Sequence, residues 1–430
     1  MDRLVLGFIV TLVLGMSCLL LARSTPMSAN DMSRWATVER LVFKGTYVIN
    51  GSHFSNTLDR IFSVDEKGNK HYYSSKPAFL ATMVSGIAWV FDLVGLEIVH
   101  PGEQESRLTM SIILILINYL PFALILWCFY QYLRRSFESV PVILIAFLTV
   151  AVGTYFTGYL STLNNHTPGM TSIFASLFAL ERYRSDPKKN TKLIIWAAFF
   201  SGLAVAFESP AMLFALSLMI YIVFQTKNTV LSLKAAAACC FPVLIWIICE
   251  YLATGMLLPR QVYTMLGQTH SFRMDEYWQQ QRDVDAYLDP YPIRAFHMLL
   301  GHHGFFSLTP VFLLIPMALI VGKANIDRAF LKKIALTFLL TFVTFTVFCI
   351  KTVNYGGLCQ GFRWMFWLIP FWLMLLPEAL AILERHGRNW KIVALGLLGI
   401  SCYSAFTSLL SPWSLSWLDK LLRPELLKFM

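Results

Sequence analysis

Charged residues are scarce in this chain. Only 14% of its 430 residues are Asp, Glu, Lys or Arg, and 57% are hydrophobic, whereas a soluble domain has about a quarter charged residues. The apolar excess must therefore face lipid. The chain also lacks a CxxC pair, and all of its eight cysteines except Cys359 lie in or beside apolar runs. They are interpreted as small core residues rather than as a disulfide or metal framework.

A cleavable signal peptide is also not indicated. The first apolar run, Leu4 to Ala22, holds nineteen residues without a charge, which is the length of a membrane span. The sequence Ala22-Arg23-Ser24 that ends it is a poor cleavage site. We therefore expect an uncleaved membrane anchor.

The net charge of +10 does not indicate nucleic-acid binding, because basic residues of membrane proteins collect in cytoplasmic loops. The basic clusters share the side of the N-terminus only if residues 78–98 do not span. That segment is interrupted by Asp92 and Glu97, and apolar runs of about 10–14 residues often lie in the interface or re-enter. The clusters are Arg134/Arg135, Arg182/Arg184/Lys188/Lys189/Lys192, Lys227/Lys234, Lys323/Arg328/Lys332/Lys333 and Arg385/Arg388/Lys391.

The sequence therefore predicts an all-α, polytopic transmembrane bundle of about 11 spans, because the apolar runs are continuous rather than alternating. We expect one transmembrane domain over residues 1–410, with a cytoplasmic N-terminus, and a short C-terminal tail over 411–430 on the outer side. A first outer loop, 24–107, would contain juxtamembrane helices. A second, 254–304, is long enough to suggest a functional role.

The first outer loop begins with a candidate surface helix. Trp35, Val38 and Leu41 have helical spacing, which is typical of a helix lying on a membrane. Asp31 and Arg34 then fall near its N-terminal end, where a carboxylate is favoured. The alternative is that Asp31 or Ser33 only caps the helix.

Further polar residues fall on the same outer face. Lys76 precedes an apolar segment and is well placed to hold a lipid phosphate, or else is a snorkelling lysine. Arg363 follows a glycine-rich stretch and can reach a phosphate, or else anchors the interface. Outer turns and the 254–304 loop supply Asn165, His166, Glu208, Asp275, Glu276, His302 and His303. His302 and His303 leave a metal site open as an alternative, without a third ligand at a fixed spacing.

The order of these motifs resembles the GT-C glycosyltransferase superfamily, in particular aminoarabinose and protein O-mannosyl transferases of families 83 and 39. The resemblance covers residues 1–110 well and 300–375 in part. The chain departs from the family in having Asn30 and Met32 beside the single carboxylate of Asp31. The matching elements are Asp31, Arg34-Trp35-Ala36, Gly45-Thr46-Tyr47, Tyr73-Ser74-Ser75-Lys76-Pro77, Arg107-Leu108, Gly304-Phe305-Phe306-Ser307-Leu308-Thr309-Pro310 and Gly356-Gly357…Gly361-Phe362-Arg363.

The resemblance implies an inverting glycosyltransferase that moves a sugar from a polyprenyl-phosphate donor to a lipid, glycan or protein acceptor. Asp31 would act as the catalytic base and Arg34 would keep it ionised. Lys76, Arg363 and Tyr73 would bind the donor phosphate. The residues expected to meet the acceptor or the sugar are Glu208, His166, Asn165, Asp275, Glu276, His302 and His303.

The remaining expectations concern partners and location. No cofactor is assigned, and a divalent metal is left open because one carboxylate is too few for a site. The expected partners are the donor and membrane lipids, without nucleic acid, and the oligomeric state is not indicated. We expect a bacterial inner membrane protein with its active site on the periplasmic face. The alternatives are a transporter or flippase of lipid-linked substrates, and an inactive GT-C-like scaffold.

Overall fold

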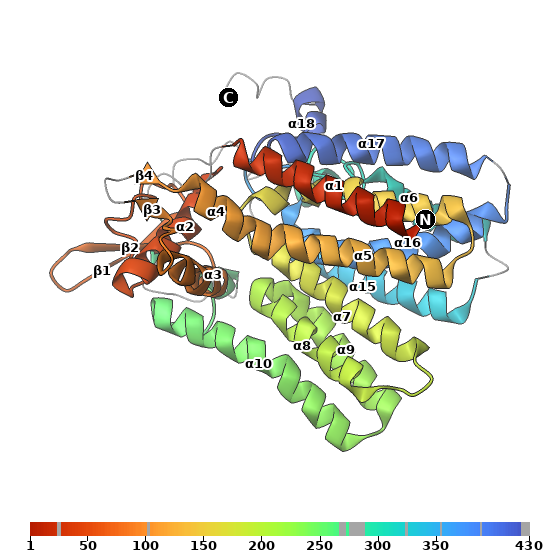
Figure 1. Cartoon of the computed structure of the whole chain (residues 1–430), viewed down its shortest axis with the longest axis horizontal. Helices are drawn as coiled ribbons and strands as arrows, with labels where there is room; N and C mark the ends of the chain where they lie inside the picture. Colours follow the sequence, from red (N-terminus) through yellow and green to blue (C-terminus); the bar gives the residue numbers. More distant parts are fainter. Residues whose placement is uncertain are drawn as a thin grey trace. The chain divides into compact units, whose positions relative to one another are not determined.

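The structure is a computed structural model that describes residues 1–23, 27–100, 104–265, 272–274, 289–322, 326–352, 355–387 and 389–422 (Figure 1). It is 73% helical with almost no sheet, which confirms the helical class. The chain forms two compact units. Unit 1 comprises Met1–Pro121 and Leu160–Arg282, and unit 2 comprises Phe122–Tyr159 and Asp283–Met430.

Unit 1 contains most of the N-terminal half of the chain. Its helices are α1 (Asp2–Leu21), α2 (Ala29–Lys44), α3 (Ala78–Asp92), α4 (Arg107–Leu114), the π-helix η1 (Ile115–Tyr119), α7 (His166–Ser185), α8 (Thr191–Phe207), the 3-10 helix η3 (Ser209–Ala211), α9 (Met212–Thr226), α10 (Thr229–Thr254) and α11 (Arg260–Met265). Its strands are β1 (Arg60–Val64), β2 (Lys70–Ser74), β3 (Val99–His100), β4 (Gln104–Glu105) and β5 (Arg273–Met274).

Unit 2 contains the C-terminal helices. The division between the two units falls inside α5 (Leu120–Ser136) and inside the 3-10 helix η2 (Tyr155–Ser161). Its central helix is α16 (Ile369–Glu384), which continues from η5 (Arg363–Leu368). Of the membrane-length part of Arg363–Glu384, 83% is buried. On this helix, the indole N–H of Trp372 donates to Thr341 of α15 at 3.0 Å. The other elements are α6 (Val140–Val152), α13 (Tyr291–Leu299), η4 (Pro310–Leu313), α14 (Leu314–Val321), α15 (Arg328–Lys351), η5 (Arg363–Leu368), α16 (Ile369–Glu384), α17 (Trp390–Leu410) and α18 (Trp417–Leu422).

Helix α2 confirms the helix expected from the spacing of Trp35, Val38 and Leu41. Ser28 caps its N-terminus by accepting from the backbone N–H of Asp31 at 3.1 Å. Gly45 ends it in the left-handed conformation at φ 61°, which glycine adopts without strain. The fully buried Trp35 and Val38 anchor one face of the helix.

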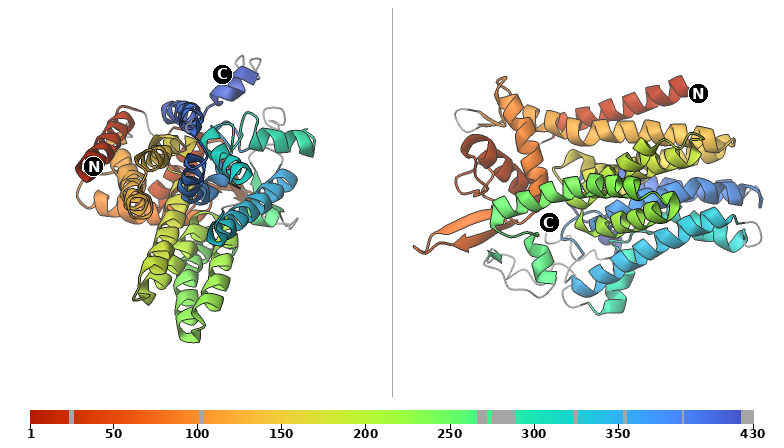
Figure 2. Two further views of the ribbon diagram at one scale, coloured as in Figure 1. Left: turned by 90° about the vertical axis from the view of Figure 1, so that its right-hand side faces the viewer. Right: turned by 90° about the horizontal axis from the view of Figure 1, so that it is seen from below.

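A β-hairpin follows α2 and was not expected from the sequence. Strands β1 and β2 pair antiparallel with Ile61 opposite Tyr73, and β5 adds a short third strand beside β1. At the turn, the Asp65 carboxylate accepts from the backbone N–H groups of Lys67 and Asn69. Figure 2 shows β1 and β2 as two long orange-red arrows. The hairpin leads directly into α3, because β2 ends shortly before α3 begins.

Among the residues that the structure describes, seven helical stretches are long and apolar enough to cross a membrane, or eight if α6 and η2, bent by 42°, form one span. The finer count of about 11 is not confirmed. Helix α3 has 15 residues, fewer than the roughly 20 of a typical span. That residues 78–98 do not cross the membrane stays a prediction. The seven stretches are Asp2–Leu21, Arg107–Ser136, Ser209–Thr226, Thr229–Thr254, Arg328–Lys351, Arg363–Glu384 and Trp390–Leu410.

Candidate functional site

A pocket lies in unit 1, where α2, β2, the start of α3 and the end of α10 meet. Its polar lining comprises Thr37, Tyr47, Tyr73, Ser74, Lys76, Glu250 and Thr254. Two residues that the sequence assigns to the donor phosphate, Tyr73 and Lys76, therefore share one pocket. The pocket combines a cation, two phenol groups and a carboxylate beside the apolar helix α3.

Lys76 is held in place by Asp59. Its ammonium lies 2.6 Å from the Asp59 carboxylate, and the hydroxyl of Ser75 donates to the same carboxylate. The two side chains are only 17% and 11% exposed, so the pair is largely withdrawn from water. The sequence analysis missed Asp59, although the Asp65–Asn69 turn between β-prone segments was a signal for the hairpin that brings Asp59 beside Lys76.

Glu250 is a second acidic residue that the sequence analysis missed. It lies near the end of α10 and is only 3% exposed. Its carboxylate accepts from the backbone N–H of Ala78 at 2.7 Å, so it satisfies an orphan donor at the N-terminus of α3, where a negative charge is favoured. Nothing local in the sequence connects Glu250 with Ala78, because 172 positions separate them.

Tyr47 closes another side of the pocket. Its hydroxyl and that of Thr82 on α3 are 2.8 Å apart, which links the turn after α2 to α3. Burial raises the pKa of Tyr47 above its usual value, so the phenol stays protonated at neutral pH and can donate a hydrogen bond to a ligand.

Asp31 does not line the pocket. It is fully buried, and its two carboxylate oxygens accept from the backbone N–H groups of Leu163 at 2.8 Å and Met27 at 3.0 Å. Burial raises the pKa of Asp31 from 3.8 to about 6, against the opposing effect of these amides and of the charge on Arg34. In this structure both carboxylate oxygens of Asp31 therefore face backbone amides.

The predicted residues Arg34, Asn165, His166 and Glu208 come together in one buried polar network in unit 1. Arg34 donates to the side-chain oxygens of Asn30 and Asn165. The Asn165 amide donates to Glu208 at 2.7 Å, and His166 Nδ1 lies 2.5 Å from the same carboxylate. The network thus joins the first turn of α2 to the start of α7 and the end of α8.

A glycine on α7 makes room for this network. A Cβ at Gly169 would lie 2.7 Å from Cγ of Glu208, closer than real side chains approach. The lack of a side chain at Gly169 therefore allows the Glu208 carboxylate to reach His166 and Asn165.

Arg363 belongs to unit 2 and begins η5. It is buried, and its guanidinium lies over the ring of Trp413 at 4.8 Å from the centroid, a cation–π contact. A Cβ at Gly356, which has φ +110°, would lie 3.4 Å from Nε of Arg363. The positive φ of Gly356 favours glycine in this stretch, and the contact of Arg363 with a phosphate stays a prediction.

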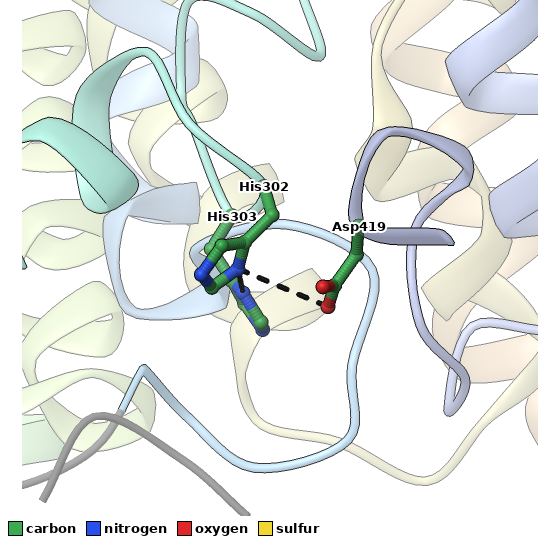
Figure 3. A group of neighbouring side chains, drawn as sticks. All are labelled: His302, His303 and Asp419. Atoms are coloured by element: carbon green, nitrogen blue, oxygen red, sulfur yellow. Dashed lines mark hydrogen bonds and ion pairs between the residues drawn. The ribbon is translucent and has the colours of Figure 1, made fainter. Parts of the chain in front are cut away.

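His302 and His303 are also in unit 2, buried beside Asp419 of α18. The donor atoms of the three side chains all lie within 4.8 Å of one another, as Figure 3 shows. Asp275 and Glu276 lie outside the described residues. Asp419 was missed because it falls in the segment expected to be a simple tail.

No family profile, characterised protein or solved structure matches this chain. The resemblance to the GT-C superfamily thus rests on the motifs themselves. What the described site offers chemically is a lysine beside a buried aspartate, two tyrosines and a glutamate around one pocket, and Asp31 with its supporting network in the same unit.

Proposed function

We propose that the chain is an inverting membrane glycosyltransferase that uses a polyprenyl-phosphate sugar, as the GT-C resemblance implies. One observation carries this proposal. Tyr73 and Lys76, which the Tyr-x-x-Lys-Pro motif assigns to the donor phosphate, line one pocket at the start of α3. Such a pocket suits a lipid phosphate, because a lysine supplies a point charge and the neighbouring apolar helix suits the lipid chain.

The lipid part of the donor has an apolar surface available on the same helix. Trp89 and Val90 near the end of α3 are each 52% exposed. A prenyl chain packed along α3 would bury this surface. Burial of apolar surface would stabilise the bound donor by roughly 25 cal/mol per Å². The phosphate at Lys76 and the chain along α3 then define one orientation of the donor.

In the proposed reaction, Asp31 takes the proton from an acceptor hydroxyl. The acceptor oxygen forms a bond to the anomeric carbon while the bond from that carbon to the phosphate oxygen breaks, with inversion. Lys76 stabilises the negative charge of the leaving polyprenyl phosphate. A pKa of about 6 leaves Asp31 ionised at neutral pH, and such a base typically contributes about 10²–10⁴-fold.

The supporting network gives Asp31 a defined position. Arg34 lies one turn after Asp31 on α2, and its charge favours the ionised carboxylate. Asn165 accepts a hydrogen bond from Arg34 and is itself held by Glu208. We include in the proposal about 11 spans, a cytoplasmic N-terminus and an active site on the periplasmic face of a bacterial inner membrane.

Two observations favour the alternative of an inactive scaffold. Asp31 is fully buried and the charge of Lys76 is already paired with Asp59. A scaffold of this kind would bind the donor lipid without cleaving it, so binding and turnover must be measured separately.

The test uses the purified full chain in liposomes that contain radiolabelled polyprenyl-phosphate sugars and a mixture of lipid and peptide acceptors. We expect release of polyprenyl phosphate together with transfer of the label to an acceptor. Donor binding without release would identify a scaffold, and movement of intact donor between leaflets without release would identify a flippase. Either result would overturn the proposal.

A further inference from the structure

We propose that His302, His303 and Asp419 form a transition-metal site in unit 2, with Zn²⁺ as the best-matched ion. His302 and His303 lie in the turn after α13, and Asp419 lies on α18. Figure 3 shows the two imidazoles and the carboxylate pointing toward one another. This site is separate from the pocket and the polar network of unit 1, and the proposal does not depend on glycosyl transfer.

All three side chains are withdrawn from water. His302 and Asp419 are 0% exposed and His303 is 2% exposed. A buried carboxylate is unfavourable unless a positive charge or hydrogen bonds compensate it. A divalent cation between the two imidazoles and the carboxylate would supply that charge.

The distances are close to those of a coordination shell. Nδ1 of His302 lies 2.6 Å from Nδ1 of His303 and 3.8 Å from Oδ2 of Asp419. Ligand bonds of about 2.0–2.1 Å in a tetrahedral zinc site place two ligand atoms about 3.3 Å apart. These two separations differ from that value by less than about 1 Å, and the ligand atoms of the third pair lie within 4.8 Å of each other.

The tautomer of His303 favours the same arrangement. Nε2 of His303 lies 3.4 Å from the carbonyl oxygen of Gly357. If Nε2 carries the proton and donates to that carbonyl, Nδ1 presents its lone pair toward His302. Metal-bound histidines almost always donate their second ring N–H in this way. The ring of Tyr355 stacks on His303, with centroids 5.4 Å apart, and fixes its plane.

The backbone around the ligands is also constrained. Gly301 and Gly304 flank the two histidines, and a Cβ at Gly304 would lie 2.8 Å from the carbonyl oxygen of Gly301 and 2.9 Å from that of Leu299, so the turn favours glycine there. Ser416 connects the two halves of the site. Its hydroxyl donates to the carbonyl of His302 at 2.7 Å and accepts from the backbone N–H of Asp419 at 3.0 Å.

Two imidazoles and one carboxylate are a ligand set that suits Zn²⁺, whereas Mg²⁺ and Ca²⁺ prefer oxygen ligands alone. Three protein ligands leave the fourth tetrahedral position for a water molecule. Because the ligands come from residues 302–303 and from α18, the bound ion would fasten α18 to the turn after α13.

The experiment uses the full chain purified in detergent through a tag without histidines. The chain is stripped with a chelator and titrated with Zn²⁺ and, separately, with Co²⁺. We expect about one Zn²⁺ per chain, visible absorption bands of four-coordinate Co²⁺, and a zinc-dependent rise in unfolding temperature. Asp419→Asn and His303→Gln should each weaken zinc binding more than tenfold, and Ser416→Ala by about tenfold through loss of support for the ligands.

The matched control is His386→Gln, because His386 is an exposed histidine of unit 2 at the end of α16, outside the proposed site. It should bind zinc like the unaltered chain. The wild-type measurements stand even if a ligand variant fails to fold. A folded wild-type chain with no Co²⁺ bands and no zinc-dependent stabilisation would overturn the proposal, as would equal zinc affinity in folded Asp419→Asn.

Discussion

At the scale of single residues, Asp31 and Lys76 carry the two charges on which the proposed reaction depends, and other groups of unit 1 already engage both. Asp31 accepts two backbone hydrogen bonds and Lys76 pairs with Asp59. Motif order pointed to both residues. The Leu163 amide could not be found from the sequence, because 132 positions separate it from Asp31, whereas the hairpin that brings Asp59 beside Lys76 had a local turn signal.

The raised pKa of Asp31 gives stability a specific pH dependence. The folded chain binds this proton with a pKa of about 6, and the ordinary value is 3.8. The folded state therefore holds the proton more tightly than the unfolded state. The stability that this bound proton contributes is lost as the pH rises from about 4 to 6. The full shift corresponds to about 3 kcal/mol.

We predict that Asp31→Asn, which cannot ionise, gains stability relative to wild type by up to about 3 kcal/mol as the pH is raised from 4 to 7. The measurement is denaturant unfolding of both proteins in detergent at several pH values. The difference in free energy of unfolding between the two proteins at pH 4 reflects the hydrogen bonds that the substitution removes. Only the change of that difference with pH therefore tests the pKa of Asp31. A difference that does not change with pH would contradict this account.

The Lys76–Asp59 pair predicts a non-additive effect of substitution. Lys76→Ala leaves the Asp59 carboxylate mostly buried without its cation, which should lower the free energy of unfolding by about 3 kcal/mol. Adding Asp59→Asn removes that charge and should restore at least about 1 kcal/mol. Unfolding of wild type, both single variants and the double variant measures the coupling. Purely additive losses would show that the pair is not energetically linked.

At the scale of secondary-structure elements, local patterns predicted α2 and the short α3 but not the hairpin between them. Apolar residues at helical spacing and the capping residues Ser28 and Gly45 are local signals, so α2 was accessible. The hairpin had a local turn signal around Gly68, but its strands of five residues each lack the long apolar runs from which the helices were predicted. The pocket itself requires α10 to pack beside α3, a contact that one-dimensional periodicity cannot specify.

Close packing of α8 against α10 gives a prediction for one glycine. A Cβ at Gly202 would lie 1.9 Å from the carbonyl oxygen of Cys239, so the two helices approach closely only because residue 202 has no side chain. Gly202→Ala should force them apart and lower the free energy of unfolding by about 1–3 kcal/mol.

The control for this prediction is Gly86→Ala on α3, where a Cβ would meet nothing within 4 Å. That variant should be neutral or slightly stabilised, because alanine favours a helix over glycine. Unfolding of both variants in the same detergent makes the comparison. Equal effects of the two substitutions would show that helix propensity, and not packing, determines the result.

At the scale of the whole molecule, composition and apolar runs were enough to predict a helical membrane protein. Its orientation rests on the placement of basic clusters, and the decisive segment is α3. If α3 does not cross the membrane, the hairpin and the stretch after α3 lie on one side. Long-range pairs such as Glu250 with Ala78, or His302 with Asp419, depend on the folded chain and could not be read from spacing.

A labelling experiment tests this orientation. Single cysteines at Lys67 and Leu96, in a background without the native cysteines, should both react with a membrane-impermeant maleimide added from the periplasmic side. A cysteine at Lys188, in a predicted cytoplasmic loop, should react only after the membrane is permeabilised. Labelling of Lys67 and Leu96 positions from opposite sides would show that α3 spans, and would invert the assignment of every later loop.

The most direct test of the account is the rate of sugar transfer from a polyprenyl-phosphate donor by the wild-type chain and by Asp31→Asn, reconstituted at equal amounts and compared across pH 5–8. The account predicts that wild-type turnover reaches half its maximum near pH 6 and that Asp31→Asn loses about 10²–10⁴-fold in rate while it still binds donor. Full turnover by folded Asp31→Asn would contradict it.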